Sequence, residues 1–275
     1  MTTLQEAPPV GTPSDEEAVR PPSTAVRRLV VTAIQVALVA GFLGLWELAS
    51  RREWIDPLLF GRPSEVWTAF FEYVPSEAGI ESMKATMTAV ALAFVIGSVV
   101  GTVAGLVLGL SKWCDDIFGP FLVPLNSIPR IALAPMFIAW FGLTTDAKVF
   151  LAVTIVFFIL AENARSAVKS VDPDLMTMAK VVGLKRASLL WKVVLPSAVP
   201  TLFAGLRLTF TYSLLGVIAS EMIAATAGIG QDIVLYSSGY QINTVFAIII
   251  ELVILAVVLN AIFQAVERRL LRWQD

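Results

Sequence analysis

The chain has 275 residues, 57% of them hydrophobic, and a mean hydropathy of +0.78, so we expect an integral membrane protein, because a soluble domain this apolar would aggregate. A net charge of −2, with no basic patch interleaved with aromatic residues, argues against nucleic-acid binding. One cysteine excludes an internal disulfide and a cysteine-cluster metal site, and the lack of histidine excludes histidine bases, Ser-His-Asp triads and HExxH zinc sites.

The N-terminal segment, residues 1–26, is rich in Pro, Ser, Thr and acidic residues and has no apolar periodicity. This composition predicts a disordered cytoplasmic tail, for which plain solvated disorder is preferred to a regulatory role. The first apolar run, about Leu29 to Ala49, starts too late for a signal peptide and is followed by no small-residue cleavage site. We therefore expect a retained first span, preceded by Arg27 and Arg28, and a transmembrane domain over residues 27–275.

The next segment, residues 50–84, has a mixed composition. Residues 63–70 combine a capping pattern with apolar positions and predict a surface helix. Its aromatic side chains are expected at the membrane interface.

The second span, about Ala85 to Leu110, carries Gly97, Gly101, Gly105 and Gly109 at intervals of four residues. Glycines at this spacing lie on one helix face and allow a neighbouring membrane helix to approach closely. The alternative is a set of unrelated glycines. We predict a packing face with no chemical role.

The third span, about Phe118 to Gly142, is interrupted by prolines. Each one removes a backbone donor and bends or breaks a helix. They are Pro120, Pro124, Pro129 and Pro135. Such breaks occur at membrane depth only where protein or a wet cavity satisfies the backbone, so we expect this segment to border a translocation path.

Arg130 lies inside this broken span, where a cation in lipid is costly. It is expected to face a cavity, a carboxylate or an interface. A structural partner or a lipid headgroup contact competes with direct solute binding. The path residues predicted here are Pro129, Arg130, Pro135 and Trp140.

A fourth span, about Ala147 to Leu160, leads into a polar loop over residues 163–196. Glu162 and Arg165 stand one turn apart and can pair. The loop predicts a helical hairpin at one membrane face, although an ordinary amphipathic connector is the alternative reading.

Capping and turn residues define the two helices of that hairpin. Asp172 can cap the first helix, Pro173 suits its first position, and Gly183 can adopt the positive φ that ends it. The second helix, about Arg186 to Leu195, is expected to end at Pro196.

Charged residues also occur in the last two spans, about Thr201 to Ala225 and Val245 to Val266. Glu221 is a functional candidate for the translocation path, with an interfacial or inter-helix salt bridge as the equally weighted alternative. Glu251 is expected to pack or pair. The Asp115-Asp116 pair is interpreted as a solvated loop.

Two stretches resemble a known family. The order Ala179-x3-Gly183-x9-Val193-x-Leu195-Pro196 resembles the EAA loop of ABC importer permeases, although Thr177 stands where the family usually has Glu and Met178 where it usually has Ala. The run Ile128 to Pro135, followed by Trp140-Phe-Gly142, resembles the permeases of the nitrate/sulfonate/taurine group, especially members that handle thiamine-precursor pyrimidines or flavins. The resemblance covers about residues 30 to 273.

This resemblance implies the type I ABC importer permease fold, an all-α membrane protein with about six transmembrane helices and a cytoplasmic coupling hairpin. The implied activity is transport of a small solute of the classes just named. The loop implies ATPase-coupling residues, namely Asp172, Thr177, Ala179, Gly183, Leu195 and Pro196. The implied partners are ABC ATPase subunits, a second permease copy as a homodimer, an extracytoplasmic solute-binding protein and the lipid membrane, with no nucleic acid.

The chain has no G-x4-G-K-S/T phosphate loop, so we expect a transport subunit that is not itself an enzyme and binds no cofactor. ATP and Mg would be bound by the partner ATPase. The distribution of Lys and Arg predicts a multi-pass protein of the inner (cytoplasmic) membrane with both termini cytoplasmic. The alternative function is an ion-gradient-driven secondary transporter or channel that uses Arg130, Glu221 and Glu251 as relay groups.

Overall fold

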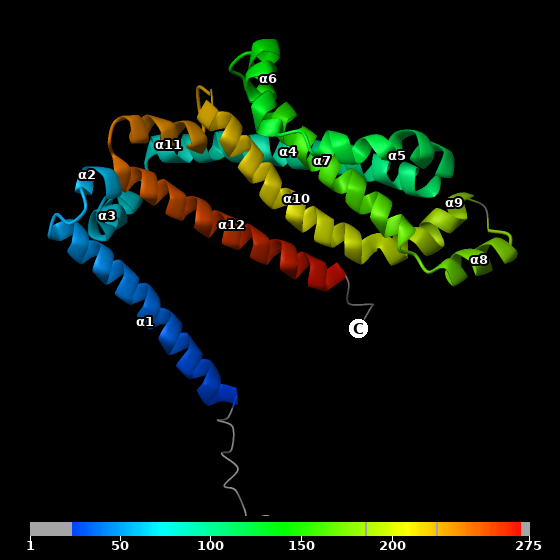
Figure 1. Cartoon of the computed structure of the whole chain (residues 1–275), viewed down its shortest axis with the longest axis horizontal. Helices are drawn as coiled ribbons and strands as arrows, with labels where there is room; N and C mark the ends of the chain where they lie inside the picture. Colours follow the sequence, from blue (N-terminus) through cyan, green and yellow to red (C-terminus); the bar gives the residue numbers. More distant parts are fainter. Residues whose placement is uncertain (1–23, 185, 224, 271–275) are drawn as a thin grey trace, which may run out of the picture.

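The structure, a computed structural model, describes residues 24–184, 186–223 and 225–270. All the regular structure in these ranges is helical, as predicted (Figure 1). The first helix, α1, begins at Thr24, and the rest of the expected N-terminal tail lies outside the described residues.

The described residues contain five helices that are long and apolar enough to cross a membrane, or six if one bent pair counts as a span. The bent pair joins α5 (Lys112–Asn126) to a short 3-10 helix, η1 (Arg130–Leu133), and α6 (Ala134–Phe141). The five helices are α1 (Thr24–Arg51), α4 (Glu77–Leu110), α7 (Thr145–Lys169), α10 (Leu195–Ile223) and α12 (Ile242–Leu270). This count confirms the predicted fold class.

Helices α4, α7 and α10 form the packed centre of the bundle. The glycine face of α4 lies against α7: a Cβ atom at Gly97 would be 2.7 Å from the Cβ of Val156, and one at Gly101 would be 2.6 Å from the carbonyl oxygen of Phe157. Gly105 and Gly109 face Ala161 and Val168 further along the same helix. Because no side chain fits between these backbones, the glycines allow α4 and α7 to pack along most of their length.

Short helices lie at the two ends of this bundle (Figure 1). We call one end the hairpin end; it carries α8 (Pro173–Val181), α9 (Arg186–Leu189) and the π-helical turn η2 (Leu190–Val194). The opposite end carries α2 (Pro57–Phe60), α3 (Pro63–Tyr73) and α11 (Ile229–Ser238). The predicted surface helix over residues 63–70 is therefore present as α3.

A hydrogen bond at the opposite end ties α3 to α11. The Tyr73 hydroxyl donates to Asp232 at 2.6 Å, and the Tyr73 ring packs edge-on against Tyr236. Burial and the neighbouring carboxylate both raise the pKa of Tyr73, so the phenol stays protonated and keeps donating.

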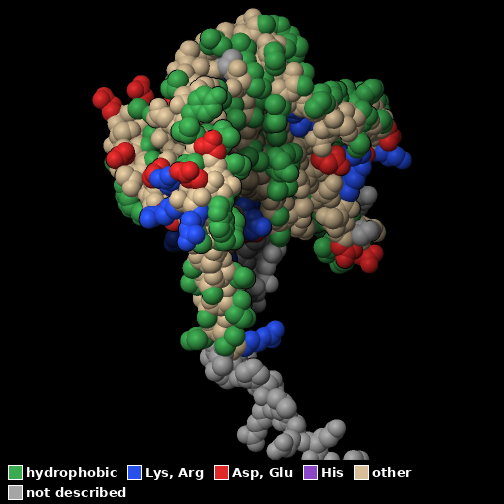
Figure 2. Space-filling view, turned by 60° about the vertical axis from the view of Figure 1, so that its left-hand side comes forward, with side chains coloured by type: hydrophobic (Ala, Val, Ile, Leu, Met, Phe, Trp, Pro, Cys, Tyr) green, Lys and Arg blue, Asp and Glu red, His purple; other side chains and the backbone are tan. Residues whose placement is uncertain are grey.

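Helix α1 stands away from the central bundle, and its apolar window has no buried residue. Its main contacts are with α2 and α3, and Trp46 packs edge-on against Phe246 of α12. Hydrophobic side chains cover α1, while charged side chains gather near its two ends (Figure 2). This distribution is that of a helix surrounded by lipid.

Two boundaries differ from the sequence predictions. Pro196 does not end a helix, because the chain continues from α9 through η2 into α10. The backbone N–H of Leu195 donates to the carbonyl of Leu190, five residues back, which makes a π-helical turn. Pro196, which has no backbone N–H, comes directly after this turn, and the helix continues through it. The prediction of a solvated loop at Asp115-Asp116 is also wrong, since both residues lie in the first turns of α5, which Ser111 caps.

Candidate functional site

The third span is broken at residues 127–129, where α5 and the segment formed by η1 and α6 meet at 87°. Pro129 has an extended backbone at the start of η1, and Pro135 occupies the first turn of α6. Pro120 and Pro124 lie inside α5. The expected interruption is thus a sharp bend between two short helices.

Arg130 is the first residue after this bend. One of its terminal guanidinium nitrogens, Nη2, donates to the side-chain oxygen of Asn126 at 2.8 Å and to the carbonyl of Leu125 at 3.3 Å. The guanidinium carbon lies 4.6 Å from the ring centre of Phe158 on α7. Arg130 is therefore held against α7 by neutral oxygens and an aromatic face.

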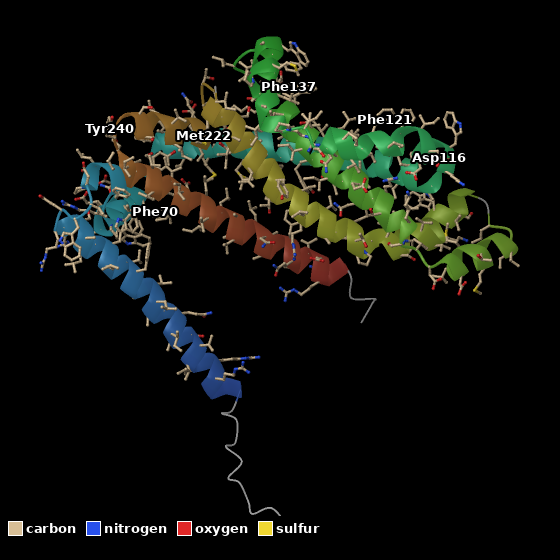
Figure 3. The ribbon with its side chains drawn as sticks, in the orientation of Figure 1. Phe70, Asp116, Phe121, Phe137, Met222 and Tyr240 are labelled. Carbon is tan, nitrogen blue, oxygen red and sulfur yellow. The ribbon has the colours of Figure 1, made fainter. Side chains whose placement is uncertain are left out.

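Trp140 lies near the end of α6 and is 64% exposed. It packs edge-on against Phe137, whose ring stacks with Phe141 and Phe150. In Figure 3, Phe137 lies on α6, which projects from the bundle, and Phe121 lies on α5. The structure brings Pro129, Arg130 and Pro135 together at the bend, and it places Trp140 further along α6.

Glu221 lies elsewhere, in the fully buried interior of the opposite end. Its carboxylate accepts hydrogen bonds from the Lys148 ammonium at 3.1 Å, the Thr86 hydroxyl at 2.9 Å and the backbone N–H of Gly230 at 3.0 Å. Lys148 also donates to the carbonyl of Ala227. These contacts join α4, α7, α10 and the start of α11.

The burial of Glu221 favours the inter-helix salt bridge over the reading as a path residue. A buried carboxylate is stable when a cation and several donors satisfy it, and Glu221 has both. Sequence reasoning missed its partners, Lys148 and Thr86. The one available signal was a lysine inside an apolar helix, which needs a counter-ion as much as the glutamate does.

The hairpin begins with the capping interaction expected from its sequence. The Asp172 side chain accepts from the backbone N–H of Asp174 at 2.8 Å. At the other end of α8, Leu184 N–H donates to the carbonyl of Ala179 at 3.0 Å, and Gly183 adopts φ +77°. This is the bonding pattern of a Schellman cap, which requires a left-handed residue at the glycine position.

The base of the hairpin is seated on the bundle by a small apolar core of Val168, Val171 and Val194, with Leu106 of α4 packed against it. Ala179 is buried, whereas Thr177 is exposed on α8. Leu195 and Pro196 begin α10, and Leu195 packs against a neighbouring cluster that includes Ala164 and Ala167 of α7. The predicted coupling residues thus lie within one compact structure at the hairpin end.

The hairpin also presents an apolar surface beyond the bundle. Met178 is 64% exposed, and Val181 and Val182 are 83% and 76% exposed. Leu175 and Trp191 are also exposed. We call these five residues the hairpin apolar surface.

An ion-pair cluster next to the hairpin links α5 to α7. Asp115 accepts from Arg165 Nε at 2.5 Å and from the Lys169 ammonium at 2.6 Å. Arg165 also contacts Glu162 at 3.5 Å, which confirms that pair. Sequence reasoning missed Asp115 because its partners are 50 and 54 residues away.

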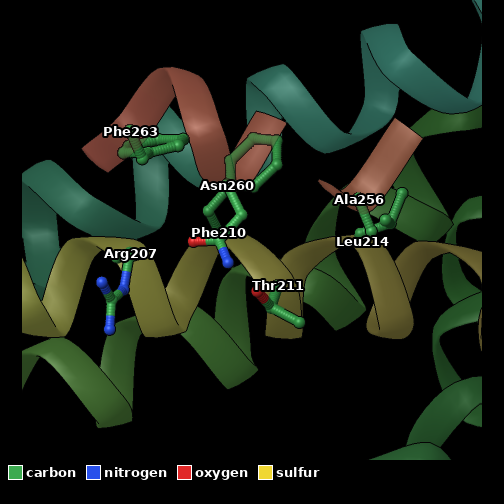
Figure 4. Close-up of a pocket in the computed structure, with 7 residues that line it drawn as sticks. All are labelled: Arg207, Phe210, Thr211, Leu214, Ala256, Asn260 and Phe263. Carbon is green, nitrogen blue, oxygen red and sulfur yellow. The ribbon is translucent and has the colours of Figure 1, made fainter. Parts of the chain in front are cut away.

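A small pocket lies between α10 and α12 (Figure 4). Its polar members are Arg207, Thr211 and Asn260. Arg207 lies 3.9 Å from Glu267. No group of acidic or cysteine side chains suited to holding a metal ion occurs in the described ranges.

Comparisons with known proteins agree with this architecture. The family described as "Binding-protein-dependent transport system inner membrane component" matches residues 97–272. The protein named as an aliphatic sulfonates transport permease, SsuC, of Escherichia coli K12 is 31% identical over 251 residues, which cover 91% of this chain and 95% of the relative. The taurine transport system permease protein TauC of the same strain is 28% identical, with 87% and 89% covered.

Solved structures share the fold. The inward-facing MetNI methionine ABC transporter aligns with a TM-score of 0.60 at 19% identity and covers 78% of this chain and 99% of its own. A bacterial ABC transporter involved in alginate import aligns with a TM-score of 0.62 at 18% identity, with 88% and 96% covered.

The matching family replaces the alternative of a gradient-driven transporter or channel, and it agrees with the absence of an ATP-binding motif from the sequence. Together with the spans, the broken third helix and the hairpin, it establishes what the chain is. The chain belongs to the binding-protein-dependent transport system inner membrane component family and is a membrane-spanning permease subunit of an ABC importer.

Proposed function

We propose that this permease imports a small sulfonate, using ATP hydrolysed by a separate ATPase that docks on the hairpin. The observation that carries the docking is the hairpin apolar surface. It is exposed at the end of the bundle, and its base is fixed to α4 and α7 by the valine core. A rigidly seated apolar surface is suited to receive a groove on a partner and to transmit its motion.

The assembly proposed is two copies of this chain, two ATPase subunits and an extracytoplasmic solute-binding protein. ATP and Mg would be bound by the ATPase subunits, and this chain would bind no cofactor. Closure of the ATPase pair would move both hairpins and thereby switch the path between its two openings. The orientation that places the hairpin and both termini in the cytoplasm follows the distribution of Lys and Arg.

The sulfonate class is favoured by the extent of the similarity. The sulfonate and taurine relatives match 86–91% of this chain. The riboflavin relative RibX of Chloroflexus aurantiacus matches 59%, and the formylaminopyrimidine relative ThiX of Halalkalibacterium halodurans matches 56%. Nitrate, pyrimidines and flavins are therefore the comparison solutes for a test.

The test is solute-dependent ATP hydrolysis and uptake in liposomes that contain this chain, a partner ATPase and the binding protein. Taurine and ethanesulfonate are compared with nitrate, a formylaminopyrimidine and riboflavin. We expect both activities to rise with a sulfonate and to require this chain. A response to another solute would reassign the cargo, and uptake without the ATPase would contradict the ATP-driven mechanism.

A further inference from the structure

The depth of Arg130 in the bundle follows from its contact with Phe158. The guanidinium lies 4.6 Å from the centre of that ring. Phe158 is 13 residues from the first residue of α7 and 11 from the last. The polar residues Glu162 and Arg165 follow Phe158 within the same helix, so the charge lies toward the hairpin end of the apolar segment of α7.

A lipid headgroup is the other anion within reach of Arg130 at this depth, because a long side chain near the end of a span can extend to the headgroup layer. The headgroup contact considered from the sequence is therefore the competing outcome of the transport measurement described below.

Two other buried or half-buried cations of the spans are paired with carboxylates. Lys148 pairs with Glu221, and Arg165 pairs with Asp115. None of the ion pairs found in the described ranges includes Arg130. Its hydrogen bonds use one nitrogen and reach only neutral oxygens, although a guanidinium has five N–H donors.

Residues 126–129, next to Arg130, are exposed in the single chain, and the backbone between α5 and η1 is irregular there. Such backbone is tolerated at membrane depth where it lines a water-filled cavity or is covered by protein.

We propose that Arg130 binds the anionic group of the transported solute at the bend between α5 and α6. The proposal rests on the proposed function, because it is a sulfonate that supplies the negative charge. A guanidinium presents two parallel donors that fit the oxygens of a sulfonate, and its remaining nitrogens are directed by the contacts with Asn126 and Phe158. The solute thus gains a counter-ion inside the span, where an anion is unstable in lipid.

Transport gives the first measurement. Arg130→Gln is expected to lower uptake of ethanesulfonate about tenfold or more, and Arg130→Lys is expected to restore part of it. Arg207→Gln is the matched control, because it also removes a guanidinium from a span. Arg207 lies 3.9 Å from Glu267 and therefore has a carboxylate partner within the chain. Equal losses in Arg130→Gln and Arg207→Gln would overturn the proposal.

A second measurement does not depend on knowing the cargo. The single native cysteine is replaced by Cys114→Ala, and Ser127→Cys places a thiol at the bend in the full-length chain in liposomes. The thiolate displaces methanesulfinate from a methanethiosulfonate reagent and forms a mixed disulfide. The rates are compared for the 2-sulfonatoethyl reagent, an anion, and the 2-(trimethylammonio)ethyl reagent, a cation.

We expect both reagents to react, with a ratio of anionic to cationic rates that falls about tenfold when Arg130→Gln is added. Absence of reaction would show that the bend is not in an aqueous path, and an unchanged ratio would show that Arg130 does not attract anions there. Either result overturns the proposal. If the ratio changes but no sulfonate is transported, the anion site stands and the proposed cargo alone is wrong.

Discussion

The charged residues in the spans fall into two kinds, distinguished by whether the chain neutralises them. Glu221 and Lys148 neutralise each other inside the protein, and three other groups, Thr86, Gly230 and the Ala227 carbonyl, supply the remaining donors and acceptors. Arg130 is held by neutral groups beside exposed residues. Burial with a full set of partners identifies a structural charge, whereas a charge in a span without a counter-ion is available to a ligand.

Replacing Glu221 should therefore destabilise the fold. Glu221→Gln leaves the Lys148 ammonium buried without a carboxylate, and removal of one partner from a buried pair typically costs about 3–5 kcal/mol. The measurement is the unfolding midpoint of the purified chain in detergent. Glu267→Gln, at the partly exposed pair with Arg207, is the control and should change the midpoint little.

A double variant tests whether Glu221 and Lys148 act as a pair. Glu221→Gln combined with Lys148→Met removes both charges and should recover part of the stability that Glu221→Gln alone loses. If the double variant unfolds at a lower midpoint than Glu221→Gln alone, the two side chains do not act as a pair.

The sequence indicated which residues were unusual but not how they are paired. Glu221 and Arg130 could be identified because a charge within an apolar run is costly wherever the helix packs. Lys148 is 73 residues from Glu221 in the chain, and Thr86 is 135 away. Such pairings depend on how α4, α7 and α10 cross, which the hydrophobic pattern of each helix does not determine.

At the scale of helices, the glycine face of α4 sets how closely α7 can approach. Gly101→Ala places a Cβ 2.6 Å from the Phe157 carbonyl oxygen, so the two backbones must separate. We expect a loss of about 1–3 kcal/mol, the usual effect of overpacking, measured as a lower unfolding midpoint. Gly44→Ala on α1, where no atom lies within 4 Å of the new Cβ, should be neutral or slightly stabilising.

The link between α5 and α7 can be tested in the same way. Asp115→Asn weakens the contacts with Arg165 and Lys169 that hold the start of α5 to the end of α7. Hydrogen exchange in residues 112–119 should become faster, because the first turns of α5 lose their charged anchor. The neighbouring, exposed Asp116 provides the control, and equal exchange in Asp115→Asn and Asp116→Asn would contradict the role given to Asp115.

The apolar runs predicted the spans well, and the breaks between them less well. Hydropathy located all the long helices, but α4 and α7 extend beyond their apolar segments because polar residues continue the same helix outside the lipid. Pro196 was expected to end a helix, yet a π-helical turn before it lets the helix continue. A proline restricts the backbone only at and just before its own position. The packing of Val194 against Val168 and Val171 determines the direction in which the chain continues after it.

At the scale of the whole molecule, α7 and α10 connect the two ends. Lys148 and Glu221 fix their opposite ends to each other and to α11, while Val168 and Val194 fix their hairpin ends to each other. The two helices are thus joined at both ends, and α4 packs against both of them. A force applied to the hairpin would move this pair as one body, and the bend at residues 127–129 lies beside it.

The hairpin must then keep its shape under load, and Gly183 is the residue whose backbone is least replaceable. Its φ of +77° is disfavoured for side chains other than Asn, Asp and Gly, and no atom lies within 4 Å of a new Cβ, so any effect arises from the backbone alone. Gly183→Val should distort the cap of α8 and lower the solute transported per ATP hydrolysed by about tenfold, whereas Gly183→Asn should retain most of it. The measurement is uptake and ATP hydrolysis by the reconstituted importer, at equal amounts of protein in the membrane. If Gly183→Val transports as well as Gly183→Asn does, the shape of this turn does not matter for coupling, and the docking surface must lie on other residues of the hairpin.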